Sequence, residues 1–304
     1  LPIYFGITLD HLILEFDPSY DEGHSLFRAE PTEKMQHRYR ISIDNAKEML
    51  RLVRNKNLSF TPVGSVQGWS PDSYHAAATE LIEAGFDYIA LGGLARASNN
   101  DIIPTLQRLT PLFKESGVRV HFLGVARHNI LDVFMESGIT SCDSASTILQ
   151  AFKSNKDNYH TAGKAYTAIR IPAVKGDASP KVRKLLQSFS VHGDREGFEK
   201  RENELHELEQ KALLAIRKYA ARKVDLSEAM KPLTLYEDQF ADEKKYYPLF
   251  EETLRDRPWE QCPCTICQQI GVDVVILRGN NRNRRRGFHN THVFYQQFKD
   301  YVAI

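Results

Sequence analysis

The sequence contains few cysteines, no long apolar run and no excess of charge of either sign. Among its 304 residues are four cysteines, 40 basic and 39 acidic residues. No stretch reaches the roughly 18 apolar residues of a membrane span, and the start lacks the features of a signal peptide, so we expect a cytoplasmic protein with no membrane partner. The balanced charge excludes a general field that attracts polyanions, so binding of nucleic acid would need a local basic patch.

The first half of the sequence repeats one unit. A short apolar run ends in polar or glycine residues, and an amphipathic stretch of helical period follows. This alternation predicts parallel βα units, and nearly continuous apolar strands predict a sheet covered on both faces. The expected strands are 4–13, 59–68, 88–94, 120–126 and 139–146, and the expected helices are 34–54, 71–84, 101–115 and 128–137.

Polar and glycine residues end those five runs, which is where a TIM-type barrel places its active site. The fold class that we expect is α/β, a TIM-type (β/α)8 barrel, and a doubly wound open sheet is the alternative. Five units do not close a barrel, so we expect about three further N-terminal units upstream of Leu1. We expect barrel units over 1–153, a mostly helical insertion over 154–255, and a zinc-binding subdomain with an arginine-rich loop and a closing helix over 256–304.

Three of the four cysteines, Cys262, Cys264 and Cys267, fall within six positions as C-x-C-x-x-C. This spacing is too tight for a disulfide framework and predicts a metal site in a reducing compartment. A later histidine, His289 or His292, would complete a closed tetrahedral zinc site. Its role would be structural, because four protein ligands leave no position for water.

Candidate chemical groups lie at the strand ends. Asp143, in ITSCDSAS, is followed by small residues, and it could attack a sugar carbon, act as a general base or merely cap a helix. Gly92 and Gly93 would admit a flat ligand to the backbone, or form a tight turn. Gln67 can donate and accept hydrogen bonds, and Asp10 could accept two of them from the edge that guanine presents.

The stretch RGNNRNRRRG, at 278–287, places five arginines in nine positions. Arginine forks match phosphate oxygens, and counterion release favours each contact, so the stretch predicts a nucleic-acid interface. The candidate phosphate contacts are Arg282, Arg284, Arg285 and Arg286. Alternatively, the stretch only solubilises the zinc subdomain or pairs with the acidic segment 236–256.

Six motifs in one order resemble the tRNA-guanine transglycosylase superfamily, which exchanges a guanine in nucleic acid for a 7-deazaguanine. The motifs are SVQG (65–68), FDYIALGGLA (86–95), FLGVA (122–126), GITSCDS (138–144), C-x-C-x-x-C (262–267), and HN followed by FYQQ (289–297). The resemblance covers most of the chain outside 154–255.

The resemblance implies that Asp143 is the nucleophile and forms a covalent aspartyl-sugar intermediate. It implies base contacts by Asp10, which reads the guanine-like edge, and by Gln67, Gly93 and Leu94. The strand-end glycines Gly92 and Gly124 are further candidate base contacts. It also favours His289 as the fourth zinc ligand, since the family uses the histidine of an HN pair before an aromatic helix. One extra residue before FYQQ keeps His292 as an alternative. The family's second aspartate, a proton-transfer partner, is expected upstream of Leu1.

Two departures from the tRNA enzymes resemble the DNA-modifying branch, the DpdA-like transglycosylases that insert 7-cyano-7-deazaguanine into DNA. SASTIL follows the nucleophile where the tRNA enzymes have proline, threonine and arginine, and Arg96 and Ser98 occur where the bacterial tRNA enzymes place a glutamate. This branch implies DNA, a 7-deazaguanine base and helper proteins of a DNA-modification system as partners. The alternatives are a tRNA enzyme of the same chemistry and a non-catalytic zinc-containing nucleic-acid-binding protein.

Overall fold

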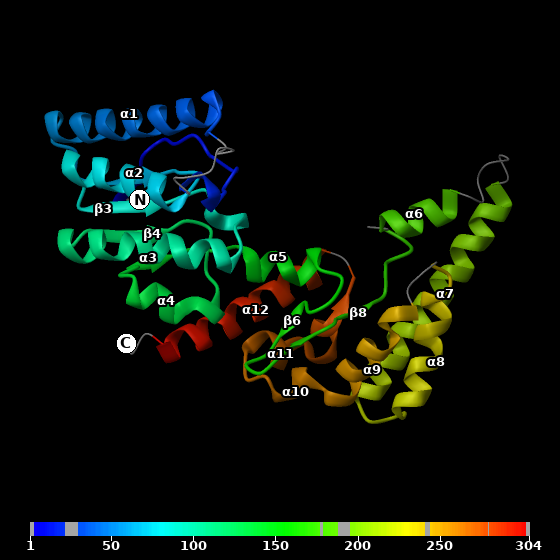
Figure 1. Cartoon of the computed structure of the whole chain (residues 1–304). Coiled ribbons are helices and arrows are strands. Elements are labelled where there is room, and N and C mark those ends of the chain that lie inside the picture. The colour runs from blue at the N-terminus through cyan, green and yellow to red at the C-terminus, as the bar shows by residue number, and fades with distance from the viewer. Residues whose placement is uncertain are drawn as a thin grey trace. The chain divides into compact units, whose positions relative to one another are not determined.

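The five apolar runs of the first half form the strands of one parallel sheet (Figure 1). The strands are β1 Phe5–Ile7, β2 Thr61–Val66, β3 Tyr88–Leu91, β4 Arg119–Phe122 and β5 Ser141–Cys142. They pair in the order β1-β2-β3-β4-β5, each parallel to the next. The prediction of five parallel βα units is therefore confirmed. Each strand is shorter than the run that predicted it, because the polar and glycine ends of the runs leave the ladder and form the loops.

The order of the strands distinguishes the two expected sheet types. A doubly wound sheet reverses its order at a switch point, whereas a barrel adds strands in sequence. The consecutive order makes this sheet a curled half-barrel of five strands. Its edge strand β1 and the residues beside it expose several apolar side chains, Ile3, Phe5, Ile7 and Leu9.

Helices cover the half-barrel: α1 Glu33–Asn55, α2 Pro71–Ala84, α3 Asn99–Ser116 and α4 Leu131–Glu136. Local signals fix the ends of α2, because Ser70 forms a capping box with Ser73 and Gly85 ends the helix with a φ of 100° that favours glycine. One face of α2 packs against β2 and β3, and its Leu81 is fully buried. Burial of such a side chain stabilises the fold by about 1.5–3 kcal/mol. The short 3-10 turns of this unit are η1 Pro18–Asp21, η2 Leu94–Arg96 and η3 His128–Ile130.

The structure describes residues 3–21, 30–176, 179–187, 195–240, 244–278 and 280–301. The chain divides into two units, Leu1–Ala145 and Ser146–Ile304, so α5, which we expected among the barrel units, belongs to the second. The second unit consists of α5 Ser146–Lys153, β6 Tyr159–His160, β7 Ala165–Tyr166, β8 Ile169–Arg170, α6 Pro180–Gln187, α7 Arg195–Ala220, α8 Leu226–Glu237, η4 Lys244–Tyr246, α9 Tyr247–Asp256, α10 Pro258–Gln261, α11 Thr265–Ile270, η5 Gly271–Val275, β9 Ile276–Leu277 and α12 Asn280–Tyr301. The short strands pair as an antiparallel β6-β7 hairpin and a parallel β8-β9 pair. The helical pair α7 and α8 packs over a core that includes Leu205, Ile216 and Tyr236.

The arginine-rich stretch is largely helical, which corrects the prediction of a loop. Asparagine and glycine have low helix propensity, and we predicted a loop from them, yet α12 runs from Asn280 to Tyr301. Tertiary packing outweighs propensity here, because α12 packs along α5. At the contact, a Cβ on Gly287 would lie 3.2 Å from Cγ2 of Ile148, so glycine allows the two helices to approach closely.

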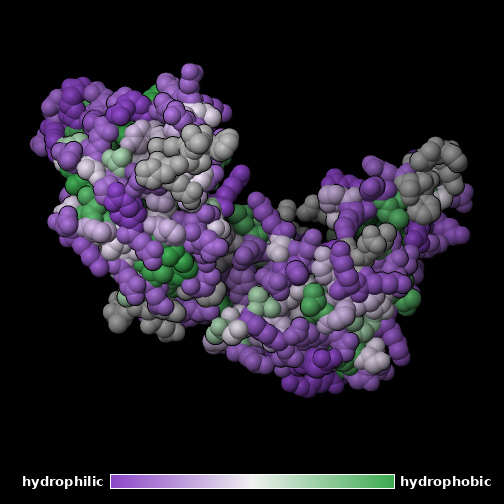
Figure 2. Space-filling model, in the orientation of Figure 1, coloured by the Kyte–Doolittle hydropathy of each residue, from purple (hydrophilic) through white to green (hydrophobic). Residues whose placement is uncertain are grey.

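Hydrophilic residues cover most of the face seen in Figure 2, and apolar residues appear there in small separate patches. Within the described ranges, no helix is both long enough and apolar enough to cross a bilayer. Buried apolar side chains instead form the interiors of the two units.

Candidate active site and metal centre

The expected chemical groups of the first unit lie where its strands end. Gln67 directly follows β2, Gly92 directly follows β3, Asp143 directly follows β5, and Asp10 lies three residues beyond β1. Because the strands are parallel, these ends share one edge of the half-barrel, the edge at which barrel enzymes hold their active sites.

Asp10 and Gln67 contact each other at this edge. The Oδ2 atom of Asp10 accepts a hydrogen bond from Nε2 of Gln67 and another, of 2.8 Å, from Oγ of Ser65. Gln67 is only 2% exposed, and its Oε1 accepts from the N–H of Ile13 at 3.3 Å. Both ends of the amide are therefore fixed. Among the described residues nothing hydrogen-bonds to Oδ1 of Asp10, so that oxygen is available to a ligand.

Gly92 and Gly93 have no side chains, and this leaves room for the side chain of Gln67. A Cβ on Gly92 would overlap Nε2 of Gln67, and a Cβ on Gly93 would lie 2.8 Å from its Oε1. Gly93 also has a φ of 83°, which side chains rarely adopt. The Tyr74 hydroxyl donates to the Gly92 carbonyl at 2.6 Å, and burial raises the pKa of Tyr74, which keeps the donor protonated. Leu94, the next expected base contact, is fully buried.

Asp143 is an exposed carboxylate that is held by one oxygen. Its side chain is 60% exposed. Oδ1 accepts a 2.8 Å hydrogen bond from the N–H of Gly124, which follows β4, and lies 3.2 Å from Nε2 of His121. Among the described residues, Oδ2 has no hydrogen-bond partner. The carboxylate therefore has a fixed orientation and one oxygen that is free to react.

Sequence analysis missed the side chains behind Asp143. Nδ1 of His121 lies 2.8 Å from Oγ of Ser141, and this Oγ lies 2.7 Å from the hydroxyl of Tyr88. His121 and Ser141 are paired residues of β4 and β5, so they share a face of the sheet. The available signal was a histidine within a largely apolar strand, two positions before that strand's loop.

The three clustered cysteines lie at the turn between two short helices of the second unit and in the first turn of the second helix, α11, which contains Cys267. Cys262 ends α10, and Cys264 begins α11 with its Sγ accepting from the N–H of Cys267 at 3.3 Å. His289 comes from α12, and its Nδ1 lies 3.5, 3.4 and 3.3 Å from the sulfurs of Cys262, Cys264 and Cys267. Ordinary zinc bond lengths in a tetrahedron would separate nitrogen and sulfur ligands by about 3.6 Å. This donor set therefore fits a metal ion, and its fourth member is His289 and not His292.

Residues around the cluster orient the His289 ring and favour the thiolate form of Cys262. The Nε2 atom of His289 lies 2.8 Å from the carbonyl oxygen of His160, which places the ring proton on Nε2 and directs the Nδ1 lone pair to the sulfurs. The Tyr159 ring stacks on His289 at 4.0 Å, and its hydroxyl lies 3.2 Å from Sγ of Cys267. Hydrogen bonds with Cys267 and His289 lower the pKa of Cys262 to about 3. One thiol of the group is thus already favoured as a thiolate.

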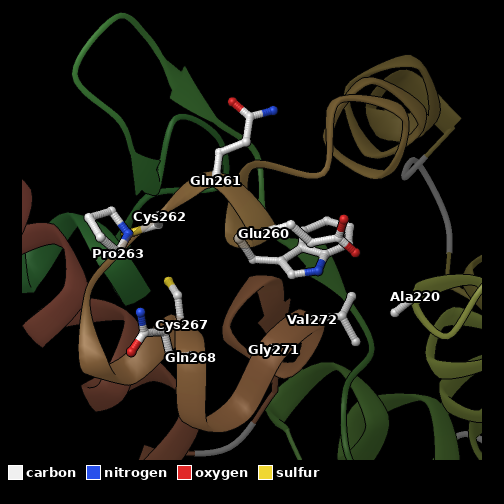
Figure 3. A pocket seen from close by; sticks show the side chains of 10 residues that line it. Ala220, Glu260, Gln261, Cys262, Pro263, Cys267, Gln268, Gly271 and Val272 are labelled. Carbon is white, nitrogen blue, oxygen red and sulfur yellow. The ribbon is translucent and has the colours of Figure 1, made fainter.

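A pocket of about 560 Å³ opens beside this cluster. Figure 3 shows Cys262 and Cys267 on one side of the pocket and Ala220 and Val272 on the other. The pocket therefore borders two of the four residues of the cluster, Cys262 and Cys267.

The arginine-rich helix presents two of the four expected phosphate contacts to solvent. Arg284 and Arg285 are exposed, and within the part of the chain that the structure describes neither forms an ion pair. The side chain of Arg282 lies outside the described residues. Two adjacent free guanidinium groups on one helix remain suitable for phosphate.

We correct the prediction that Arg286 contacts phosphate. This side chain is fully buried, and its guanidinium donates to the carbonyl oxygens of Ala151 at 2.9 Å, Val274 at 3.2 Å and Ile276 at 3.3 Å. Burial lowers the pKa of Arg286, and these carbonyl oxygens offset part of the cost of burying its charge. Arg286 connects α12 to α5, η5 and β9, and that role is structural.

Comparisons with known proteins give one clear relative. No family model matches the chain. The chain is 35% identical to a protein of Salmonella montevideo named DNA-guanine transglycosylase, in an alignment of 304 residues that covers 99% of this chain and 69% of the relative. The alignment thus extends over both units.

Proposed function

Because the chain belongs to the DNA-guanine transglycosylases within the tRNA-guanine transglycosylase superfamily, and is therefore a base-exchanging pentosyltransferase, we propose that it replaces guanine in DNA with a 7-deazaguanine. The incoming base in this proposal is 7-cyano-7-deazaguanine. The observation that carries the mechanism is the geometry of Asp143, a strand-end carboxylate with one oxygen fixed and the other free.

In the proposed first step, Oδ2 of Asp143 attacks C1′ of the target nucleotide, and the bond from C1′ to the guanine nitrogen breaks. The bonding electron pair leaves with guanine, which gains one proton, and a covalent sugar ester of Asp143 remains. In the second step the incoming base loses one proton from its ring nitrogen and attacks C1′, and Asp143 leaves as a carboxylate. Two inversions retain the configuration, as in retaining glycosidases.

The base would be recognised by the cluster around Asp10 and Gln67. A carboxylate can accept hydrogen bonds from both the ring N–H and the amino group of a guanine edge, and Oδ1 of Asp10 has no partner among the described residues. Gly93 is partly exposed on the adjacent turn, where its backbone can approach a flat ring. A guanine stacked in a duplex cannot reach these groups, so the enzyme would flip the nucleotide or act on unpaired DNA.

Three further features complete the proposal. The half-barrel would be part of an eight-stranded barrel, and the apolar side chains exposed along β1 support this, because a neighbouring strand would cover them. The ion held by the cysteine cluster would be a structural zinc, since three thiolates and one imidazole fill a tetrahedral shell. The reduced thiols of that site support a cytoplasmic location.

The decisive experiment measures the release of radiolabelled guanine from DNA and from tRNA side by side. The full-length protein should release guanine from DNA when 7-cyano-7-deazaguanine is added, and should prefer DNA to tRNA. SASTIL supplies no cation after Asp143, whereas the resemblance gives the tRNA enzymes an arginine there. Modification of tRNA alone would refute the choice of branch and leave the transglycosylase chemistry intact.

Replacing Arg284 and Arg285 together with alanine should weaken DNA binding about equally for every sequence. Each phosphate contact releases counterions, so the slope of log affinity against log salt should fall in magnitude by roughly one to two units. Fluorescence anisotropy titrations at several salt concentrations measure this slope.

A matched control replaces Arg40 and Arg51, two arginines exposed on α1, with alanine. It should leave the slope of log affinity against log salt unchanged. An equal loss of slope in the control variant would show that general charge, and not the arginine-rich helix, accounts for DNA binding.

A further inference from the structure

The Oδ1 atom of Asp143 faces two nitrogen atoms, one from the backbone and one from a side chain. The N–H of Gly124 donates to it at 2.8 Å, and Nε2 of His121 lies 3.2 Å away. The His121 side chain is only 19% exposed, so its partners are largely protein atoms. Both nitrogens contact the same carboxylate oxygen, Oδ1. The other oxygen, Oδ2, has no partner among the described residues.

The hydrogen-bond partners assign the protons of this network. An ionised carboxylate only accepts, so Nε2 of His121 must carry hydrogen. With hydrogen on Nε2 only, Nδ1 is an acceptor, and the Ser141 hydroxyl, 2.8 Å away, can donate to it. The Tyr88 hydroxyl in turn donates to Oγ of Ser141 at 2.7 Å. The donors therefore run in one direction, from Tyr88 through Ser141 and His121 to Asp143.

The far end of this network is also fixed. The Tyr88 ring packs edge-on against Phe5 with centroids 5.7 Å apart, and the Arg119 guanidinium lies 4.6 Å from the centre of the same ring. Arg119 is also paired with Asp87 at 3.5 Å. Strands β1, β3, β4 and β5 thus all contribute to holding the imidazole in one orientation before any substrate binds.

We propose that His121 stabilises the Asp143 carboxylate as the leaving group of the second displacement. In the sugar ester, Oδ1 is a weakly accepting carbonyl oxygen. When the incoming base forms its bond to C1′, the bond from C1′ to Oδ2 breaks and its electron pair returns to the carboxylate. The hydrogen bonds from His121 and Gly124 strengthen as this charge develops, so they lower the barrier to departure. The inference rests on the proposed function, in which Asp143 is the nucleophile.

The test follows the decay of the covalent adduct. Enzyme and guanine-containing DNA are mixed while released guanine is removed, an excess of free guanine is then added, and denaturing gels record the loss of adduct. Guanine is used because it reverses the first step whichever modified base the enzyme takes. In His121→Ala the adduct should decay about 10- to 100-fold more slowly and accumulate to a higher level. The Kd for DNA, measured in the Asp143→Asn background where no adduct forms, should change by less than about two-fold, because no DNA contact is assigned to His121.

Further variants separate this role from folding. His121→Gln should recover most of the decay rate, because its amide nitrogen can donate from a position similar to that of Nε2. Ser141→Ala should slow the decay to a smaller extent, since it frees the ring that Ser141 orients, and it carries the test if His121→Ala does not fold. His75→Ala, on α2 and away from the network, should behave as the wild-type enzyme.

Decay at the wild-type rate in a folded His121→Ala, or in Ser141→Ala if the former is unfolded, would overturn the inference alone. The adduct formed in those same samples would still support the proposed function. If the wild-type enzyme formed no adduct with DNA, the proposed function would fail, and this inference would fail with it.

Discussion

Replacing Asp143 with asparagine should reduce base exchange to less than about one thousandth of the wild-type rate. The amide retains the shape of the carboxylate, and its oxygen can still accept the hydrogen bond from Gly124, but it cannot attack a sugar carbon. DNA affinity should therefore stay nearly unchanged. Guanine release and denaturing gels measure the two chemical outcomes, and the variant should give neither free guanine nor a covalent adduct.

Asp44→Asn is the matched control, because Asp44 is an exposed carboxylate on α1. It should exchange bases at the wild-type rate. If Asp143→Asn retained normal exchange, the covalent mechanism would be wrong, and another group would have to supply the nucleophile.

Loss of one cysteine of the metal cluster should unfold the surrounding part of the second unit. Binding of structural zinc contributes about 10–16 kcal/mol in small zinc-binding peptides, which is comparable to the whole stability of a domain. Cys264 and Cys267 also lie within the hydrophobic core of this unit, so loss of the ion would disturb buried residues. Cys264→Ser should lower the zinc content from one equivalent to nearly none and expose residues 258–301 to proteases.

Metal analysis and limited proteolysis measure these two effects, and His292→Ala is the control. His292 is not part of the cluster, so this variant should keep both its zinc and its resistance to proteases. Wild-type protein that carried less than about half an equivalent of zinc, without prior chelation, would contradict the assignment.

The sequence predicts the half-barrel well because its strands are almost continuously apolar and its helices are amphipathic. The strand bounds are less accurate, since pairing with a neighbour decides where a strand ends, and β5 keeps only Ser141–Cys142 of its longer run. In the second unit, β8 and β9 pair across most of the unit's length in the sequence. No local pattern could have revealed that pairing.

The residues of the candidate site were likewise predicted from the sequence only in part. Asp10, Gln67 and Asp143 stand at strand ends, so their clustering on one edge followed from the expected fold. The contact of His121 with Ser141 depends on the register of β4 against β5, which the sequence does not reveal.

Because Arg286 is buried, the inner side of the arginine-rich helix should tolerate mutation less well than its exposed side. Lysine has a single ammonium group, so it cannot serve all of the carbonyl oxygens that the guanidinium binds, and even this mild exchange should impair folding. Arg284 and Arg285 lie in solvent, where lysine would preserve the positive charge. Substitutions on the exposed side of this helix can thus change its surface charge and leave the fold intact, whereas selection for a folded protein holds its buried side constant.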